Sequence, residues 1–182
     1  TAMSAVRVRL RAMIAAAGGT YNDTTGTITL PSGGGGAAPD IVRLALNGTA
    51  DMSYNAGNVM PISWTLELED AAGYHADPQN SRITVPAGRG GVFLMTGLID
   101  LVGSGVTDSA VSVSLNGQFY ADLASLPSGY TQASFSATLR LAAGDYVVIN
   151  IWTAAGSGLA VRAKHPSMSA RATHAELVRI GG

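Results

Sequence analysis

The stretch from Arg82 to Leu101, RITVPAGRGGVFLMTGLIDL, contains the pattern that decides the fold. It predicts a short strand over Arg82–Val85, a turn over Pro86–Gly91 and a long strand over Val92–Leu101. Successive side chains of a strand alternate between its two faces, so a sheet with one solvated face shows alternating apolar and polar residues. Both faces of this long strand are apolar, so each of them needs to be covered.

The strands of the chain are of two kinds. Ala110–Leu115 and Ser134–Leu141 alternate between apolar and polar residues, whereas Val92–Leu101 and Tyr146–Trp152 are apolar on both faces. We therefore predict an all-β, two-sheet jelly-roll sandwich with one solvated sheet and one dry sheet. The dry sheet would hold both two-sided strands and bury its outer face in an oligomer of identical chains. The alternative is that an N-terminal helix covers it within one monomer.

Composition excludes several functional classes. The chain has 182 residues, 47% of them apolar and only 13% charged, and a net charge of −1 argues against a nucleic-acid partner. It has no cysteine, so it has neither disulfides nor thiolate metal sites. No apolar run approaches the roughly 18 residues that span a membrane, so no membrane insertion is expected.

An N-terminal helix is predicted by apolar residues three and four positions apart, the spacing of a coiled-coil seam. The seam consists of Met3, Val6, Leu10 and Met13. A small hairpin over Thr20–Leu30 and a Gly-rich linker follow, so we divide the chain into an anchor (1–30), a linker (31–37) and a head (38–182). A helix this short is marginal alone, so it would pack on sister helices, on another protein or on its own domain.

Candidate catalytic and metal-binding residues are few. The histidines are His75, His165 and His174. His75 has acidic neighbours, which predicts either an oxygen-rich metal site or, the interpretation we favour, a solvated turn, because the spacing matches no calcium loop. His174 beside Glu176 predicts a surface or interface pair. We expect no enzymatic activity, no cofactor and no metal.

Several segments resemble one known family. The first segment contains Trp64, Glu67, Asp70, Gly73, His75 and then Ser81–Pro86 before Gly91-Val92-Phe93. Leu139-Leu141-Gly144-Asp145-Tyr146-Val147 and the closing strand Thr173–Ile180 follow the same family pattern. These features resemble the globular heads of the complement-q/tumour-necrosis-factor superfamily, over residues 38–182, and are closest to the versions in bacteriophage and prophage particles.

The resemblance implies a ten-strand jelly roll that assembles as a compact homotrimer. Its inner sheet, with Val92–Leu101 and Tyr146–Trp152, would line the three-fold axis. The resulting interface prediction consists of Phe93, Met95, Tyr146, Val148 and Trp152. No metal site of the family is implied, because this sequence has no acidic cluster equivalent to the calcium site of some animal members.

These observations predict a virion structural protein, a trimeric head or tail fibre or spike of a phage or phage-like particle such as a gene transfer agent. Residues 1–30 would bind a capsid or tail protein, and the head would decorate the particle or adhere to a cell-surface glycan. Candidate receptor-binding residues are Tyr130, Lys164 and His165. The expected location is the particle surface, after assembly in the bacterial cytoplasm.

Two alternatives remain. One is a free bacterial carbohydrate-binding lectin of the same fold, but Arg7, Arg9 and Arg11 interrupt the apolar N-terminal run, so we expect no signal peptide. The other is a jelly-roll enzyme, which needs a cluster of His and Glu metal ligands on neighbouring strands. Three scattered histidines do not favour such a cluster.

Overall fold

The chain divides into an N-terminal unit, Thr1–Pro39, and a second unit, Asp40–Gly182. The computed structural model describes residues 20–21, 28–29, 40–46, 51–76, 80–163 and 173–181. In the first unit it describes β1 (Thr20–Tyr21) and β2 (Ile28–Thr29), which pair antiparallel within the predicted hairpin. Outside the described residues lie the predicted linker and the predicted anchor helix with its seam, Met3, Val6, Leu10 and Met13.

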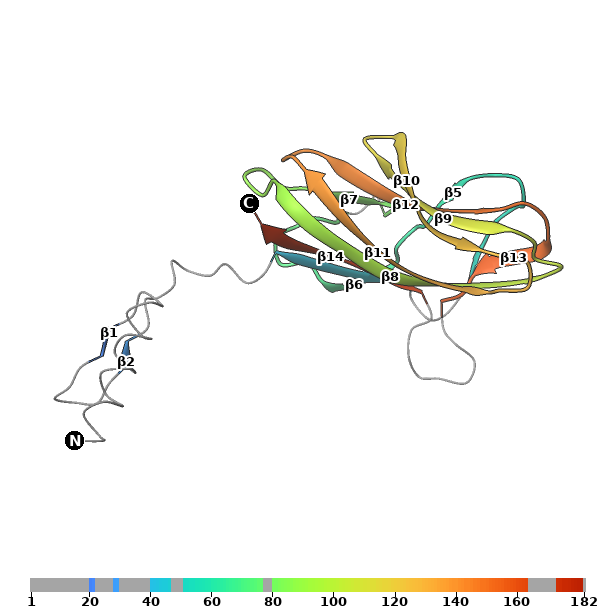
Figure 1. The fold of residues 1–182 in the computed structure, drawn as a ribbon, viewed down its shortest axis with the longest axis horizontal. Coiled ribbons are helices and arrows are strands. Elements are labelled where there is room, and N and C mark those ends of the chain that lie inside the picture. Colours follow the sequence, from blue (N-terminus) through green and yellow to red (C-terminus); the bar gives the residue numbers. More distant parts are fainter. Residues whose placement is uncertain are drawn as a thin grey trace, which may run out of the picture. The chain divides into compact units, whose positions relative to one another are not determined.

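The second unit is a sandwich of two antiparallel sheets without a helix among its described residues (Figure 1). The smaller sheet has five strands in the order β10–β9–β12–β5, and β7 also pairs with β12. Its strands are β5 (Met60–Pro61), β7 (Arg82–Thr84), β9 (Ser109–Leu115), β10 (Gln118–Leu126) and β12 (Tyr146–Thr153).

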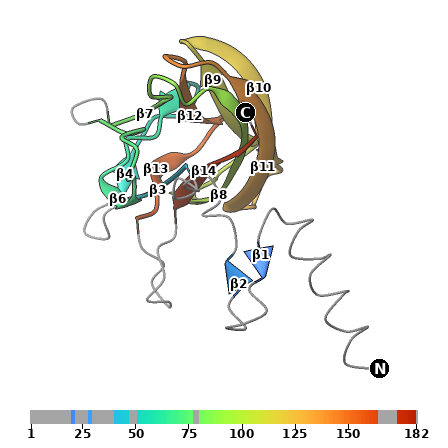
Figure 2. The same ribbon diagram turned by 90° about the vertical axis from the view of Figure 1, so that its left-hand side faces the viewer.

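The larger sheet has seven strands in the order β4–β13–β8–β14–β3–β6, and β11 also pairs with β8. Its strands are β3 (Ile41–Ala45), β4 (Met52–Ser53), β6 (Leu66–Glu69), β8 (Gly91–Ser104), β11 (Gln132–Leu141), β13 (Ser157–Val161) and β14 (His174–Gly181). Figure 2 shows β10 and β11 side by side where the two sheets approach each other at one margin.

The two-sided strands lie in different sheets, so the prediction of one dry sheet holding both is wrong. β8 belongs to the seven-stranded sheet and β12 to the five-stranded sheet. Each sheet instead combines a two-sided strand with an alternating one: β8 pairs with β11, and β12 pairs with β9. The residue pattern of a strand records the polarity of its faces, but not which distant strand it pairs with.

The inner faces of the two sheets form the core. On β8 the inward side chains are fully buried, and they are Phe93, Met95, Ile99 and Leu101. On β12 the inward aliphatic side chains are Val147, Ile149 and Ile151, which are also buried. Each such side chain contributes about 1.5–3 kcal/mol by leaving water. The other face of each strand points outward.

The β9–β10 hairpin turns at Asn116-Gly117, a dipeptide typical of two-residue hairpin turns. Both residues have positive φ, 52° and 81°, which a two-residue hairpin turn of the favoured handedness requires. The Asn116 amide also donates to Asp145 Oδ1 at 2.8 Å and accepts a hydrogen bond from Tyr146 N at 3.0 Å. The hydrogen bond from Asn116, followed by one from Ala142 N, lowers the pKa of the Asp145 carboxyl.

The segment Val59–Glu67 does not form a single strand, because the chain changes sheets within it. Ile62 N donates to Ile149 O of the five-stranded sheet at 2.9 Å. Thr65 N donates to Ala45 O of the seven-stranded sheet at 3.3 Å. β5 therefore ends before this crossing and β6 begins after it, although Ile62 is fully buried.

A buried carboxylate joins three parts of the second unit. Asp40, which precedes β3, forms an ion pair with Arg89 from the turn before β8, and Arg179 Nη1 of β14 lies 3.5 Å from Asp40 Oδ2. Tyr74 lies in the same region, where burial and then the charge of Asp40 raise its pKa to about 12. The Tyr74 ring packs edge-on against Phe93, with centroids 6.1 Å apart.

Candidate functional site

The outer face of the seven-stranded sheet carries a group of aliphatic side chains that we call the apolar face. Its members are partly exposed, and they are Leu68 on β6, Val92, Leu94 and Leu98 on β8, and Val178 on β14. Leu68 has 44% of its surface exposed. Contiguous exposed apolar patches usually mark interaction surfaces, so this face is the first candidate for a functional site.

Strand register brings two members of the apolar face, Leu94 and Val178, together. Val178 lies directly opposite Leu94, and both point away from the core because their neighbours Leu177 and Met95 point into it. Residues directly opposite on antiparallel strands have Cβ atoms about 4.5–5.5 Å apart. On β11, beyond β8, the outward residues are polar and exposed: Ser134, Ser136, Thr138 and Arg140. The apolar face therefore has a polar margin.

An ion-paired cluster lies beside the aliphatic residues. Arg43 Nε donates to Glu176 Oε2 at 2.9 Å, and Arg43 Nη1 donates to Glu69 Oε2 at 2.9 Å. The hydrogen bond that Arg43 donates to Glu176, together with the negative charge of that carboxylate, raises the pKa of Arg43 above its ordinary value. Exposed pairs of this kind contribute little to stability, but they fix the orientation of the three side chains.

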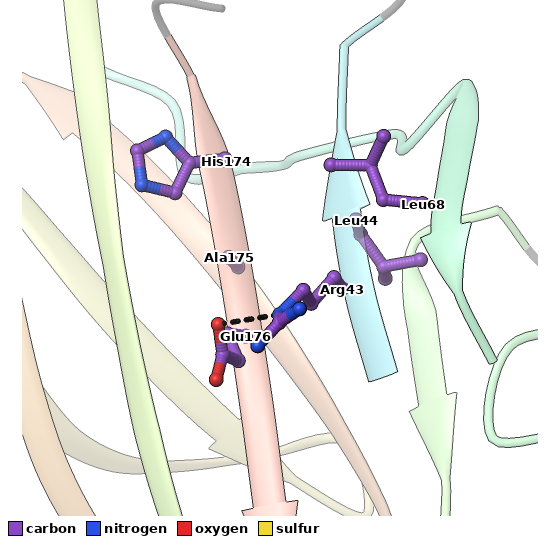
Figure 3. Close-up of a pocket in the computed structure, with 6 residues that line it drawn as sticks. All are labelled: Arg43, Leu44, Leu68, His174, Ala175 and Glu176. Atoms are coloured by element: carbon purple, nitrogen blue, oxygen red, sulfur yellow. Dashed lines mark hydrogen bonds and ion pairs between the residues drawn. The ribbon is translucent and has the colours of Figure 1, made fainter. Parts of the chain in front are cut away.

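A shallow pocket of about 270 Å³ joins this cluster to the apolar face. Its lining residues come from β3, β6 and β14: Arg43, Leu44, Leu68, His174, Ala175 and Glu176. Figure 3 shows Glu176 and Arg43 joined by their ion pair and His174 further along β14. Because its charges already pair with each other, the pocket is better suited to packing against a second surface than to catalysis.

His174 is the titratable group of this pocket whose charge changes near neutral pH. Partial burial lowers the pKa of its imidazole, and the nearby Glu176 carboxylate opposes that effect. The predicted pairing of His174 with Glu176 therefore appears in the structure as an electrostatic interaction along one strand. Arg43 and Glu69 were not predicted, although a lone Arg within the apolar strand IVRLA is a visible sequence signal.

The predicted trimer-interface residues do not share one surface. Phe93 and Met95 are fully buried in the core, so the interface prediction is wrong for them. Tyr146, Val148 and Trp152 point outward, but from the five-stranded sheet. For β8 the error lies in the choice of face. Both faces of this strand are apolar, and the side chains assigned to the interface, Phe93 and Met95, point into the core.

The predicted receptor-binding residues are only partly described by the structure. Tyr130 is 64% exposed in the turn between β10 and β11, where its N donates to Pro127 O at 3.1 Å. Lys164 and His165 lie outside the described residues. Of the three predicted receptor-binding residues, Tyr130 is therefore the one that the structure describes, and it stays a candidate contact residue.

The turn around His75 is a packed structural element. His75 is buried, its Nδ1 lies 2.8 Å from Glu67 Oε1 and its Nε2 lies 3.1 Å from Asn80 O. Asp70 accepts hydrogen bonds from Tyr74 N and His75 N, both at 2.7 Å. The predicted solvated turn is wrong for the imidazole itself. Within the described residues no group of three or more His, Cys, Asp or Glu could hold a metal ion.

Comparison with known proteins identifies the fold. No protein-family model matches the chain, and no curated protein matches its sequence. Crystal structures of murine APRIL at pH 8.0 and pH 5.0 are similar, with TM-scores of 0.53 and 0.52 and identities of 17% and 19%; each covers 78% of this chain and 99% of the other. The globular domain of zebrafish complement 1qA protein has a TM-score of 0.49 at 16% identity, over 78% of this chain and 97% of that one.

At these identities the similarity concerns the fold. It confirms the predicted all-β sandwich as a jelly roll of the tumour-necrosis-factor-like type. A separate observation concerns membranes: among the described residues, none forms a helix of the length and apolarity that crossing a bilayer requires.

Proposed function

We propose that this chain is a virion structural protein, the homotrimeric head or tail fibre or spike of a phage or phage-like particle. The N-terminal segment attaches to a capsid or tail protein, and the jelly-roll head decorates the particle or adheres to a host-surface glycan. The protein is assembled in the bacterial cytoplasm and is displayed on the particle surface.

The apolar face is the observation that carries the assembly part of this proposal. It presents Leu94 opposite Val178, with Leu98 further along β8, on strands whose other faces fill the core. A second copy of the same sheet covers such residues and removes them from water, at about 25 cal/mol for each Å² buried. The paired charges of Arg43, Glu69 and Glu176 enter the interface without leaving a charge unpaired.

Two other parts of the proposal, the trimeric state and the location on a phage particle, rest on other observations. The superfamily that the sequence resembles assembles as trimers, and the similarity to the APRIL structures supports the same fold. The motifs around Trp64–Pro86 are closest to the versions in phage and prophage particles. Three heads on one spike would give avidity for a repeated surface glycan.

Solution mass tests the assembly face. We expect the full chain to have the light-scattering mass of three copies and Leu94→Asp to have the mass of one, because leaving a buried charge unpaired costs about 3–5 kcal/mol. Val148→Asp is the matched control, since it places the same charge on a partly exposed Val of the other sheet. An unsubstituted chain that is a monomer, or a Leu94→Asp variant of unchanged mass, contradicts the proposal.

Immunogold labelling separates the particle role from the lectin alternative. Antibodies against the full chain are applied to particles released by the source bacterium and to the producing cells. Label at one end of the particles or over their heads supports a fibre, spike or decoration protein. Label on the cell surface without label on particles favours a free lectin and overturns the particle role, whatever the oligomeric state.

A further inference from the structure

β10 departs from strand alternation directly after the hairpin turn. Its register with β9 shifts between Phe119 and Ala121, which is the signature of a bulge. Phe119 and Tyr120 are neighbours, yet both are exposed, at 67% and 51%. A regular strand would turn one of two neighbours toward the core. The bulge therefore keeps two aromatic rings in solvent, and bulges often re-aim side chains near binding sites.

Phe119 lies on the outer face of the five-stranded sheet together with two further aromatic residues. Strand register places Phe119 opposite Ser114 of β9, which is itself opposite Val148 of β12. Tyr146 and Trp152 lie on the same outer face of β12 and are partly exposed. They are six residues apart, which corresponds to about 20 Å along an antiparallel strand.

Hydrogen-bonding side chains fill the space between these rings. Ser112 of β9 lies opposite Asp122 on one side and opposite Asn150 on the other. The Asn150 amide is held in place, because its Nδ2 donates to Ser114 Oγ at 2.9 Å and to Val148 O at 3.3 Å. We call Phe119, Tyr146, Trp152 and the polar residues Ser112, Ser114 and Asp122 the aromatic platform.

The charges on this face are few and of opposite sign. The guanidinium of Arg82, on β7, lies 4.2 Å from the centroid of the Tyr146 ring. Asp122 is exposed on β10. One cation held over an aromatic ring and one carboxylate do not attract a polyanion. The outward side chains of the neighbouring strands carry hydroxyl and amide groups.

We propose that the aromatic platform binds a neutral oligosaccharide. Aromatic faces pack against the C–H faces of sugar rings, and the Asp122 carboxylate and the serine hydroxyls accept and donate hydrogen bonds with sugar hydroxyls. A platform about 20 Å long accommodates several sugar units. This inference deepens the adhesion role proposed above and rests on it, and it moves the contact surface from the loops to a sheet face.

The pattern of the platform favours a sugar over a second protein surface. Buried interface centres are depleted of charged residues and closely packed. Here the hydroxyl and carboxylate groups of β9 and β10 lie between the aromatic rings, and the carboxylate of Asp122 has no cation directly opposite it in register, where Ser112 lies. A sugar hydroxyl satisfies that carboxylate without a second charge.

Affinity electrophoresis of the full chain tests the proposal. The gels contain dextran, laminarin, xyloglucan or soluble starch as neutral probes, with heparin as the polyanionic probe. We expect retention by at least one neutral polysaccharide, and a loss of about tenfold or more in affinity on Phe119→Ala or Trp152→Ala, equivalent to about 1.4 kcal/mol. Circular dichroism of each variant checks that the fold is retained.

Tyr130→Ala tests the competing loop site, and it is a fair comparison because Tyr130 and Phe119 are exposed to a similar degree, 64% and 67%. Retention that survives Tyr130→Ala but not Phe119→Ala supports the platform. Loss with Tyr130→Ala alone moves the glycan to the loops and overturns the inference while leaving adhesion intact. Retention by heparin only, or by no probe, also overturns it, and the mass and labelling experiments then decide the proposed function independently.

Discussion

The outer faces of the two sheets are both partly apolar, but they differ in kind. On β8 the outward apolar residues are aliphatic, with Leu94 opposite Val178 of the next strand and Leu98 further along, opposite His174. On β12 the outward residues are Tyr146 and Trp152, separated by Val148 and by the hydrogen-bonded Asn150. Aliphatic groups without polar partners are best covered by another close-packed surface, whereas rings between hydroxyls and amides suit a hydrated ligand.

This difference shows that a two-sided strand does not have one meaning. The outward side of β8 indicates assembly and the outward side of β12 indicates recognition, although their apolar content is similar. The ion cluster of Arg43, Glu69 and Glu176 strengthens the distinction, because the guanidinium pairs with both carboxylates beside the apolar face. The experiments below test the comparison, in order of decreasing expected effect.

The largest loss of stability is expected when one side chain is shortened on each face of β8 and the two variants are compared. Phe93→Ala removes a fully buried ring and should lower the free energy of unfolding by about 3–5 kcal/mol at every protein concentration. Leu94→Ala removes a partly exposed side chain and should mainly weaken assembly, so its unfolding midpoint should approach that of the unsubstituted chain as protein concentration rises.

Urea unfolding at several protein concentrations, followed by tryptophan fluorescence, measures both effects. Trp64 is a suitable probe because it is almost fully buried. If both variants lose a similar amount of unfolding free energy at every protein concentration, Leu94 stabilises the fold of the monomer and not the assembly. The assignment of assembly to the apolar face would then fail.

Local sequence signals were sufficient for much of the fold. The Asn-Gly pair at Asn116 is a local signal for its hairpin, because a turn with two positive φ angles favours those residues. The alternation of Ser134–Leu141 gave the inward and outward residues of β11 correctly, since one of its faces is polar. Each of these features is determined by residues that are close together in the chain.

Pairing between distant strands could not be predicted in the same way. β8 pairs with β14, about 80 residues later, and β14 in turn pairs with β3 near the start of the unit. With both faces of β8 apolar, the sequence does not distinguish Phe93 from Leu94 as the inward residue. The pairing of Arg43 with Glu69 and Glu176 depends on that same long-range register, so the pocket beside the apolar face was not predicted either.

An intermediate effect is expected at Gly97, on the core face of β8. A Cβ at this position would meet Phe135 Cζ and would lie 2.7 Å from His174 O of the neighbouring strand. Gly97→Ala should therefore lower the free energy of unfolding by about 1–3 kcal/mol. Its measurement is the same urea titration.

Gly181→Ala serves as the control for Gly97→Ala. A Cβ at Gly181 would meet only Val92 Cβ, at an ordinary 3.8 Å, so its cost should be within about 0.5 kcal/mol. Equal losses for the two variants would show that the contact with Phe135 is not tight. The separation between a closely packed inner face and a looser outer face of β8 would then be smaller than we propose.

The smallest effect concerns the pH dependence of His174 in the pocket beside the apolar face. Burial lowers the pKa of this imidazole in the folded state below the usual 6.5. The unfolded chain then binds the proton more readily, so the contribution of His174 to stability is complete above about pH 6.5 and declines as the pH falls through the folded-state pKa. The unsubstituted chain should lose about 1–2 °C more in Tm than His174→Gln between about pH 7.5 and pH 5.5, because solvent screens this exposed side chain.

Protein concentration makes the His174 experiment a test of the comparison itself. If a second copy covers the apolar face, it buries the imidazole further, lowers its pKa more and enlarges the pH-dependent difference as the chains assemble. A difference that is present but independent of concentration would leave His174 in solvent on an uncovered face. Because Glu176 opposes the shift, Glu176→Gln should enlarge the difference at any one concentration, and a smaller difference would contradict burial as its cause.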